Sequence, residues 1–329
     1  MIEILSDTAL ATVQDLGRTG ALGMGVGTAG AMDDQAVAAG NLLLGNDATA
    51  AAIEIQIFPF AVRFHAACAF AVTGADCAAR LDGEAILPWW SCQAEAGQEL
   101  VLSVPGPATW RGSRAYLCTA GGIDVPVVLG SRSTQLRGAF GGHHGRALRQ
   151  GDVLPVGAAD TQRRKTGFGV VAPALLDPLL CDGDTAVRVL PAAEHERYTP
   201  ESRAAFWEQP WKITPQSDRY GYRLSGPGLA MAEPVELRSH GIVPGVIQVP
   251  QGGQPIVQMR DAQPTGGYPK IGTVISADLW RLGQAPIGSR IRFLRCDWAE
   301  ALAAAARNRR RLDDVSRLAG LYRSQTARA

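Results

Sequence analysis

The sequence predicts a mainly β protein of the α+β class, in two parts, with a helix at its C-terminal end. Its 38 glycines and 20 prolines are spread along the chain, which indicates many turns and therefore many short strands. Short apolar runs bounded by Gly, Pro or Asp follow one another without regular alternation of strand and helix, so a parallel α/β fold is not expected. At 329 residues the chain exceeds what one hydrophobic core usually serves, so we expect two domains.

The first half contains one predicted helix among six predicted strands. Asp33 or Asp34 can cap a helix over residues 35–44, and Gly45 with Asn46 provides its C-terminal end. Apolar runs predict strands at residues 2–5, 53–57, 69–73, 99–104, 115–119 and 153–156. The polar residues 158–167 look like a connection, and we place the first domain at residues 1–183.

The second domain, residues 184–329, begins with a predicted strand at 186–190. Thr199 followed by Pro200 predicts the start of a helix, which must end by Pro210. Strands then resume and continue to residues 290–294. From Trp298 the chain is rich in Ala and Arg, which predicts a terminal helix with a solvated, charged face.

Residues 245–274 are the stretch around which the second half is organised. Apolar runs at 246–249 and 255–259 flank a glycine-rich turn and predict a β-hairpin, and a third run follows at 271–275. Between the second and third runs lies a loop rich in Gly and Pro that carries an acid, an amide, a hydroxyl, a phenol and an amine. The loop is either a barrel corner with polar tips in water or a site fixed between strands.

Lysine usage favours the second interpretation. The chain has 29 Arg but only three Lys, at positions 165, 212 and 270, and the last of these lies in the loop. Burial can lower the pKa of a lysine side chain, whereas arginine stays charged. Lys270 is therefore a candidate site residue.

Three other polar segments have two interpretations each. Arg132 lies among the hydroxyls of residues 131, 133 and 134, which either bind a carboxylate or phosphate or bond to the local backbone. Arg219 and Arg223 are anion ligands or, as we favour, structural ion-pair partners. His143 and His144 are adjacent and would point to opposite faces of a strand, so we expect no metal site there.

Composition and missing motifs exclude several classes of function. A net charge of +1 argues against binding to nucleic acid or to a membrane surface through charge. The N-terminus lacks the apolar core of a signal peptide, no apolar run has the ~18 residues of a membrane span, and no two of the six cysteines form a C-x-x-C pair. We therefore expect a cytoplasmic protein with reduced thiols. The sequence also lacks a nucleotide-binding P-loop and an H-E-x-x-H motif.

Several of these segments together resemble a known family, the C subunits of bacterial 5-oxoprolinase. The family is also described as biotin-dependent carboxyltransferase-like, allophanate hydrolase subunit 2 or KipA-like. The resemblance runs from about residue 2 to 293 and is carried by TVQDLGR at 12–18, GAMD at 30–33, GGID at 121–124, GSRST at 130–134, GGHHGRAL at 141–148, SDRYGYRL at 217–224 and the whole of 245–274.

The resemblance implies two cyclophilin-like β-barrel domains and a role in a heteromeric complex. The partners would be a B-type, KipI-like subunit and an A-type subunit. The complex would use ATP to open the lactam of 5-oxo-L-proline, a small-molecule substrate, to L-glutamate. Apolar residues beside the loop, Ile242, Val243 and Val246, would be shared with a partner.

The resemblance also implies roles for individual residues. Lys270 would act at the lactam oxygen as electrostatic stabiliser or proton donor, and Asp261 would be the base or the group that orients it. The substrate-binding residues would include the anion-binding backbone of Gly266 and Gly267, then Tyr268, Gln248, and Arg132 for the substrate carboxylate with Ser133 and Thr134.

Two other functions stay open. One is a carboxyltransferase acting on urea or a related amide, with biotin on another chain because this chain lacks the Met-Lys-Met attachment signature. The other is a KipA-like regulatory protein without catalysis. The sequence departs from the family pattern at Gln263-Pro264-Thr265 and at His240, which stands where a carboxylate is frequent.

Overall fold

The computed structural model describes residues 1–329 except 8–9, 107–111, 159–165, 234, 236 and 327–329. The chain forms two compact units: residues 1–18, 29–176 and 309–329 build the first, and residues 19–28 and 177–308 build the second. The sequence analysis did not predict that residues 19–28 belong to the second unit and residues 309–329 to the first. The boundary between 183 and 184 stays a prediction, and most of the predicted connection 158–167 lies outside the described residues.

The first unit is built from two antiparallel sheets. The six-stranded sheet has the order β11 (Val153–Leu154), β1 (Ile2–Ile4), β4 (Phe60–Phe64), β9 (Glu99–Leu102), β6 (Arg80–Leu81), β7 (Glu84–Ala85). The five-stranded sheet has the order β2 (Thr12–Gln14), β3 (Ala52–Ile55), β10 (Ala115–Thr119), β5 (Cys68–Gly74), β8 (Ser91–Ala94).

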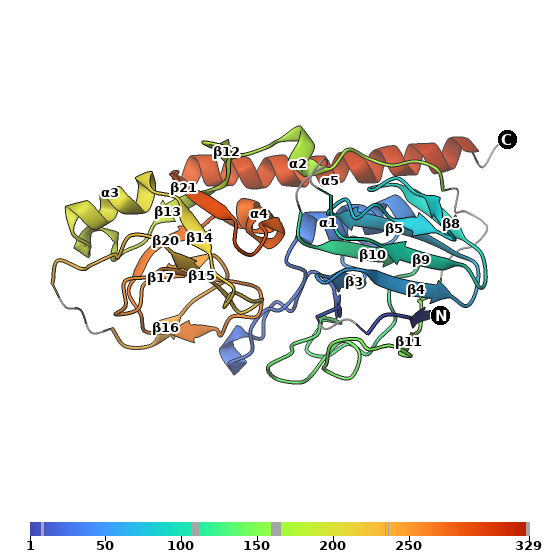
Figure 1. Cartoon of the computed structure of the whole chain (residues 1–329), viewed down its shortest axis with the longest axis horizontal. Helices are drawn as coiled ribbons and strands as arrows, with labels where there is room; N and C mark the ends of the chain where they lie inside the picture. Colours follow the sequence, from blue (N-terminus) through green and yellow to red (C-terminus); the bar gives the residue numbers. More distant parts are fainter. Residues whose placement is uncertain (8–9, 107–111, 159–165, 234, 236, 327–329) are drawn as a thin grey trace. The chain divides into compact units, whose positions relative to one another are not determined.

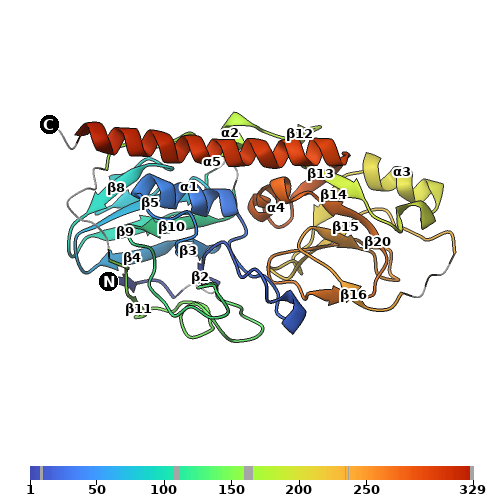
Figure 2. The ribbon, with the colours of Figure 1, turned by 180° about the vertical axis from the view of Figure 1, so that it is seen from behind.

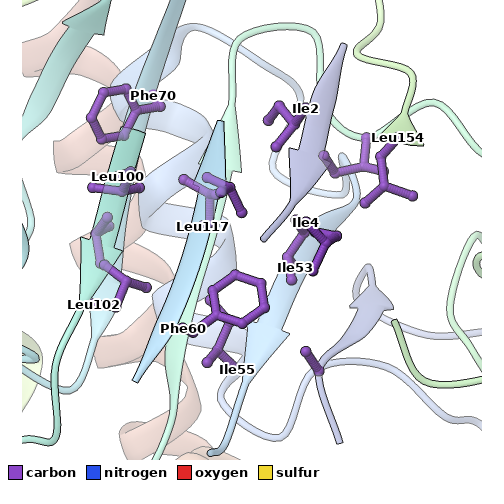
Figure 3. Packing of buried hydrophobic residues seen from close by; sticks show 14 of the residues in the cluster. Ile2, Ile4, Ile53, Ile55, Phe60, Phe70, Leu100, Leu102, Leu117 and Leu154 are labelled. Carbon is purple, nitrogen blue, oxygen red and sulfur yellow. The ribbon is translucent and has the colours of Figure 1, made fainter. Parts of the chain in front are cut away.

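The core of this unit lies between the two sheets. Strand β4 shows the reason, because Phe60, Val62 and Phe64 are buried while the residues between them are half-buried, as the period of two in a strand requires. Buried side chains from both sheets form one cluster, in which those of β1, β4 and β9 meet those of β3, β5 and β10 (Figure 3). Burying each large apolar side chain contributes about 1.5–3 kcal/mol.

Helix α1 (Asp34–Leu44) covers the other face of the five-stranded sheet, along β5 and β10 (Figure 2). Asp33 caps it, since its side chain accepts a hydrogen bond from the backbone N–H of Ala36. The helix ends at Gly45, whose φ of +75° is the left-handed conformation that glycine adopts without strain. The helix predicted over residues 35–44 is confirmed.

The second unit contains a closed barrel of seven strands (Figure 1). Parallel pairing of the first and last strands closes the ring, which leaves the barrel without free edges. Strand β12 (Leu180–Cys181) pairs with the start of the first barrel strand. The order around the barrel is β13 (Asp184–Pro191), β20 (Lys270–Val274), β17 (Val246–Gln248), β18 (Ile256–Gln258), β15 (Gly221–Ser225), β14 (Trp211–Ile213), β21 (Arg290–Arg295).

The mainly β fold class with a terminal helix is therefore confirmed. Helix α3 (Pro200–Glu208) begins after the Thr199 cap, as predicted, and α5 (Trp298–Thr326) is the terminal helix. The helices and 3₁₀ turns are η1 (Leu22–Met24), α1, α2 (Pro173–Leu176), η3 (His195–Arg197), α3 (Pro200–Glu208), η4 (Ser276–Asp278), α4 (Leu279–Gln284) and α5. Within the described ranges, none of the helices has the length and apolar character needed to cross a bilayer.

Helix α5 has residues in both units and contacts each of them. In the second unit its Ala304 packs with Ile275 and Ala277. In the first unit Arg323 donates hydrogen bonds of 2.8 and 2.7 Å to the carbonyl oxygens of Leu42 and Leu43, so it caps the C-terminal end of α1.

Candidate functional site

The predicted hairpin and the strand after it bring Gln248 and Lys270 together in the second unit. Strands β17 and β18 pair antiparallel, with Gln248 opposite Ile256, so the hairpin is confirmed. Strand β20 pairs with β17 on its other side, and a bulge between Ile247 and Gln248 sets Gln248 opposite Lys270. Residues directly opposite each other in a sheet have neighbouring side chains, and a bulge is a common device for re-aiming side chains at a site.

The Lys270 ammonium is held by two side chains from elsewhere in the unit. Its Nζ lies 3.1 and 3.3 Å from the two carboxylate oxygens of Glu194, and 2.5 Å from Nε2 of His240. The Lys270 and Glu194 side chains are 15% and 13% exposed, so the ion pair is largely removed from water but still reachable. These three residues are called the Lys270 cluster below.

Different elements position the two partners of Lys270. Glu194 precedes η3 and follows β13, whose end pairs with β20, and its carboxylate also accepts from the backbone N–H of Lys270 at 3.3 Å. His240 lies in β16 (His240–Gly241), which pairs with β19 (Thr265–Gly266) and sets His240 opposite Gly266. The sequence analysis missed Glu194, because nothing local marks a residue that lies 76 positions from its partner.

A pair of buried amides adjoins the cluster. The Nε2 of Gln258 donates a 3.1 Å hydrogen bond to Oε1 of Gln248, and the two residues are 3% and 2% exposed. The described residues offer no partner to the remaining amide nitrogen of Gln248. That nitrogen lies against Gly266, where an added Cβ would approach it to 2.5 Å. A buried donor without an acceptor is unfavourable unless a ligand or water completes it.

Tyr198 adds a second incomplete polar group near Glu194. The side chain is 1% exposed, and its hydroxyl oxygen has no hydrogen-bond partner among the described residues. Burial raises the pKa of the Tyr198 phenol, and the charge of Glu194 raises it further. The phenol is therefore neutral and stays a hydrogen-bond donor.

Asp261 is buried in an ion pair of its own. Arg219 donates to both carboxylate oxygens of Asp261, through Nε at 3.0 Å and Nη2 at 2.9 Å, and each side chain is 7% exposed. The interpretation of Arg219 as a structural partner thus fits its geometry. Because Arg219 occupies both oxygens of the Asp261 carboxylate, the geometry suits the predicted role of Asp261 as an orienting group better than its predicted role as the base.

The remaining loop residues differ in their accessibility. Tyr268 is 52% exposed and open to a ligand. Gly266 belongs to a strand pair rather than to a tight turn, and Gly267 lies beside the carbonyl oxygen of Leu237, 3.1 Å from an ideal Cβ position. The proposed anion-binding backbone of these glycines stays a prediction. Of the apolar residues expected at a partner surface, Val243 is 47% exposed, but Ile242 and Val246 are buried in their own unit.

The predicted residues Arg132, Ser133 and Thr134 lie in the first unit, around the buried Asp15. Asp15 accepts from the hydroxyls of Ser131 at 2.7 Å and Ser133 at 2.5 Å, and from the backbone N–H of Arg132 at 2.6 Å and of Gly17 at 2.8 Å. The Thr134 hydroxyl donates to the carbonyl oxygen of Val13. These hydroxyls are therefore engaged in internal bonds, while the Arg132 guanidinium, 38% exposed, pairs with Asp124 at 3.1 Å.

The placement of the adjacent histidines His143 and His144 on a strand, which the sequence analysis assumed, was wrong. His143 and His144 lie in a turn, not a strand, and their rings are 4.3 Å apart in an edge-on contact because the backbone of His144 has a φ of +56°. His143 lies 3.5 Å from Asp152, and burial lowers its pKa. Across the described part of the chain, no three or more His, Cys, Asp or Glu side chains group so as to hold a metal ion.

Comparison with known proteins identifies the class to which this fold and site belong. Residues 24–295 match the family described as carboxyltransferase domain, subdomain A and B, and the chain belongs to this family.

Two bacterial relatives are similar over nearly their whole length. The chain is 43% identical to the 5-oxoprolinase C subunit of Escherichia coli K12 over 316 residues, which are 96% of this chain and 98% of that protein. It is 39% identical to the 5-oxoprolinase C subunit of Haemophilus influenzae over 318 residues, 97% and 98% of the two chains. The family resemblance predicted from the sequence motifs is thus confirmed.

A solved structure shows the same fold inside a larger protein. The urea amidolyase of K. lactis superposes with a TM-score of 0.85 at 29% identity, over 95% of this chain. The chain corresponds to only 20% of that protein's length.

Proposed function

We propose that this chain is one subunit of an ATP-dependent 5-oxoprolinase, a hydrolase that opens the lactam of 5-oxo-L-proline to L-glutamate. The observation that carries the proposal is the near-complete match to two proteins named as the C subunit of 5-oxoprolinase, at 43% and 39% identity. The name implies further subunits, and we propose that these are a B-type and an A-type partner.

Within the complex, Lys270 acts at the lactam oxygen. Negative charge develops on that oxygen when water attacks the carbonyl carbon, and a fixed cation or a proton donor there lowers the barrier. The Lys270 ammonium has the required charge and is 15% exposed. The unpaired amide nitrogen of Gln248 supplies a second donor, and the exposed Tyr268 of the same loop as Lys270 contacts the substrate.

Asp261 keeps the loop in place through Arg219. The predicted role of Arg132, Ser133 and Thr134 in binding the substrate carboxylate is not part of this proposal, because Asp124 pairs with the Arg132 guanidinium and the two hydroxyls are engaged in internal hydrogen bonds.

The ATP of the reaction does not fit the residues of the Lys270 cluster. A triphosphate needs several donors with net positive charge, but the ammonium of Lys270 is paired with Glu194 and the guanidinium of Arg219 with Asp261. The N-terminal end of α1 is closed by its own cap Asp33. We therefore assign no step that involves ATP to this chain.

Reconstitution tests the proposal. The chain is mixed with the B-type and A-type subunits of the same organism, 5-oxo-L-proline and ATP, and glutamate release is followed. We expect Lys270→Met to lower kcat/KM about 100-fold or more. Lys212→Met, on the exposed side of β14, is the matched control and should stay within about twofold of the wild type. Wild-type turnover by a folded Lys270→Met complex would contradict the role of Lys270.

One structural observation favours a second candidate function. The fold recurs in the K. lactis urea amidolyase with a TM-score of 0.85, which favours a carboxyltransferase acting on urea or a related amide, with biotin carried by another chain. Calorimetry with free biotin and with a biotinylated carrier domain discriminates, since a 5-oxoprolinase subunit should bind neither. A stable complex with the B-type subunit but without turnover on any lactam or amide would instead indicate a regulatory, KipA-like protein.

A further inference from the structure

The number of donors on Lys270 limits what this residue does. An ammonium has three N–H donors and no acceptor. Both carboxylate oxygens of Glu194 lie on one side of Nζ, at 3.1 and 3.3 Å, and Nε2 of His240 lies at 2.5 Å. No described residue besides these two accepts from Nζ. When the two oxygens of Glu194 share one hydrogen, the third N–H of this side chain, which is 15% exposed, is available to a ligand.

The contacts of His240 define where its proton lies. Nδ1 of His240 is 2.9 Å from the carbonyl oxygen of Arg238, and because a carbonyl only accepts, Nδ1 carries the hydrogen. In the neutral ring Nε2 then has a free lone pair, and this is the atom 2.5 Å from Nζ of Lys270. An alkyl amine is a much stronger base than an imidazole. Because an ammonium is a donor only, Lys270 donates to Nε2 of His240 in this contact.

Glu194 fixes the same charge from the other side. Its Oε2 accepts from the backbone N–H of Lys270 at 3.3 Å and lies 3.1 Å from Nζ, so one carboxylate binds both ends of the lysine. Loss of the Lys270 proton would leave the Glu194 carboxylate, 13% exposed, without its counter-charge. The pair thus places a carboxylate directly against the Lys270 ammonium.

We propose that Glu194 and His240 are positioning residues that hold Lys270 as a fixed cation, with one N–H directed to an amide carbonyl oxygen. The inference rests on the proposed function and deepens it, because that function left open whether Lys270 stabilises charge or gives up a proton. On this assignment Lys270 stabilises the oxyanion by charge and a hydrogen bond, and the proton for the leaving nitrogen comes from another group.

Nuclear magnetic resonance tests the assignment without any turnover. The chain has only three lysines and five histidines, so selective ¹⁵N labelling of lysine Nζ and of the histidine ring gives few signals. We expect a slowly exchanging ammonium signal at pH 7.5 that is lost in Lys270→Arg and exchanges faster in His240→Ala. The His240 ring should carry its hydrogen on Nδ1. A hydrogen on Nε2 of a neutral His240, or a neutral Lys270 amine, would overturn the proposal.

Kinetics of the reconstituted complex separate a fixed cation from a proton donor. Arginine keeps the charge and the donors but cannot release a proton. We expect Lys270→Arg to retain about a tenth or more of kcat/KM, against a loss of about 100-fold or more in Lys270→Met. Equal inactivity of the two variants would show that proton transfer is required and would refute the assignment.

The positioning role of His240 has its own signature. His240→Ala should lower kcat about tenfold with little change in KM, because it misorients Lys270 without removing a substrate contact. His240→Gln, whose amide oxygen accepts near the place of Nε2, should restore most of kcat. A rescue that fails while the protein stays folded counts against the assignment. If the wild-type complex itself releases no glutamate, the proposed function fails, and the resonance experiment alone decides the state of Lys270.

Discussion

Two polar clusters, one in each unit, differ in how completely their hydrogen bonds are satisfied. In the first unit Asp15 receives four donors, and the two serine hydroxyls that serve it also accept from the backbone of the same segment. In the second unit the Lys270 cluster leaves an ammonium hydrogen available, and Gln248 and Tyr198 nearby each have a buried group that no described residue completes.

The difference distinguishes polar groups that stabilise the fold from polar groups that can bind a ligand. A closed network of buried hydrogen bonds stabilises one conformation and has nothing to offer a ligand. An incomplete network carries an energetic cost that a ligand can remove. Both clusters contain residue types expected at a site. The hydroxyls around Asp15 are engaged internally, whereas Gln248 and Tyr198 beside the Lys270 cluster each keep a buried group that no described residue completes.

Among the substitutions that test this comparison, Asp15→Ala is expected to lower the free energy of unfolding most. It leaves two hydroxyls and two backbone N–H groups without their acceptor in a buried place, so the free energy of unfolding should fall by about 4 kcal/mol. Urea unfolding followed by circular dichroism and tryptophan fluorescence measures it. Asp124→Ala, which removes an exposed partner of Arg132, is the control and should cost below about 1 kcal/mol. Similar losses in both variants would contradict the assigned structural role of Asp15.

The hydrogen-bonded ion pair of Arg146 and Asp152, also in the first unit, predicts that the free energy of unfolding falls by about 2 kcal/mol at low pH. Hydrogen bonds from Arg146 hold the pKa of Asp152 at about 2, below its ordinary value of 3.8. Between these values the unfolded chain binds more protons than the folded one. The contribution of Asp152 is therefore complete above pH 4 and is lost as pH falls toward 2.

Denaturant unfolding of the wild type and Asp152→Asn at several pH values checks this prediction. The two proteins should differ by about 2 kcal/mol at pH 7, and the difference should shrink as the pH is lowered below 4. A difference that stays constant down to pH 3 would show that ionisation of Asp152 does not stabilise this unit.

Gly266→Ala tests whether the buried Gln248 amide needs the space that a glycine leaves beside it. The new Cβ would lie 2.5 Å from the Gln248 amide and 3.0 Å from Cδ1 of Ile242, so we expect a loss of stability of about 2 kcal/mol and weaker substrate binding. Gly252→Ala is the matched control in the hairpin turn, because nothing lies within 4 Å of its Cβ position. Thermal unfolding and KM should distinguish the two, and an unchanged Gly266→Ala protein would refute the tight packing at this position.

The smallest effect on stability is expected from His240→Ala. The ring is half-buried and lies on a short two-stranded ribbon, so the free energy of unfolding should change by less than about 1 kcal/mol even though turnover falls. Comparing unfolding and turnover on the same preparation checks this. A large loss of stability would place His240 among the structural residues, with Asp15.

Local sequence signals determined most elements of the fold. The caps of α1 and α3, the hairpin of β17 and β18, and the strand at Ala115–Thr119 depend on residues within a few positions of each other, and all were predicted. Closure of the barrel was not predicted by any local pattern, because it requires β13 and β21, which are about a hundred residues apart, to pair in parallel.

The sequence by itself also singled out Lys270, through the rarity of lysine and the polar loop between strands, and through its motifs it identified the family. Only the tertiary structure decided which polar residues are internally satisfied. In the structure the Ser133 hydroxyl donates to Asp15, and the Asp261 carboxylate pairs with Arg219. Glu194 and His240, which are 76 and 30 positions from Lys270 in the sequence, both contact its ammonium. The physical reason is that a hydrogen bond depends on distances of about 3 Å in space, which the order of residues along the chain does not contain.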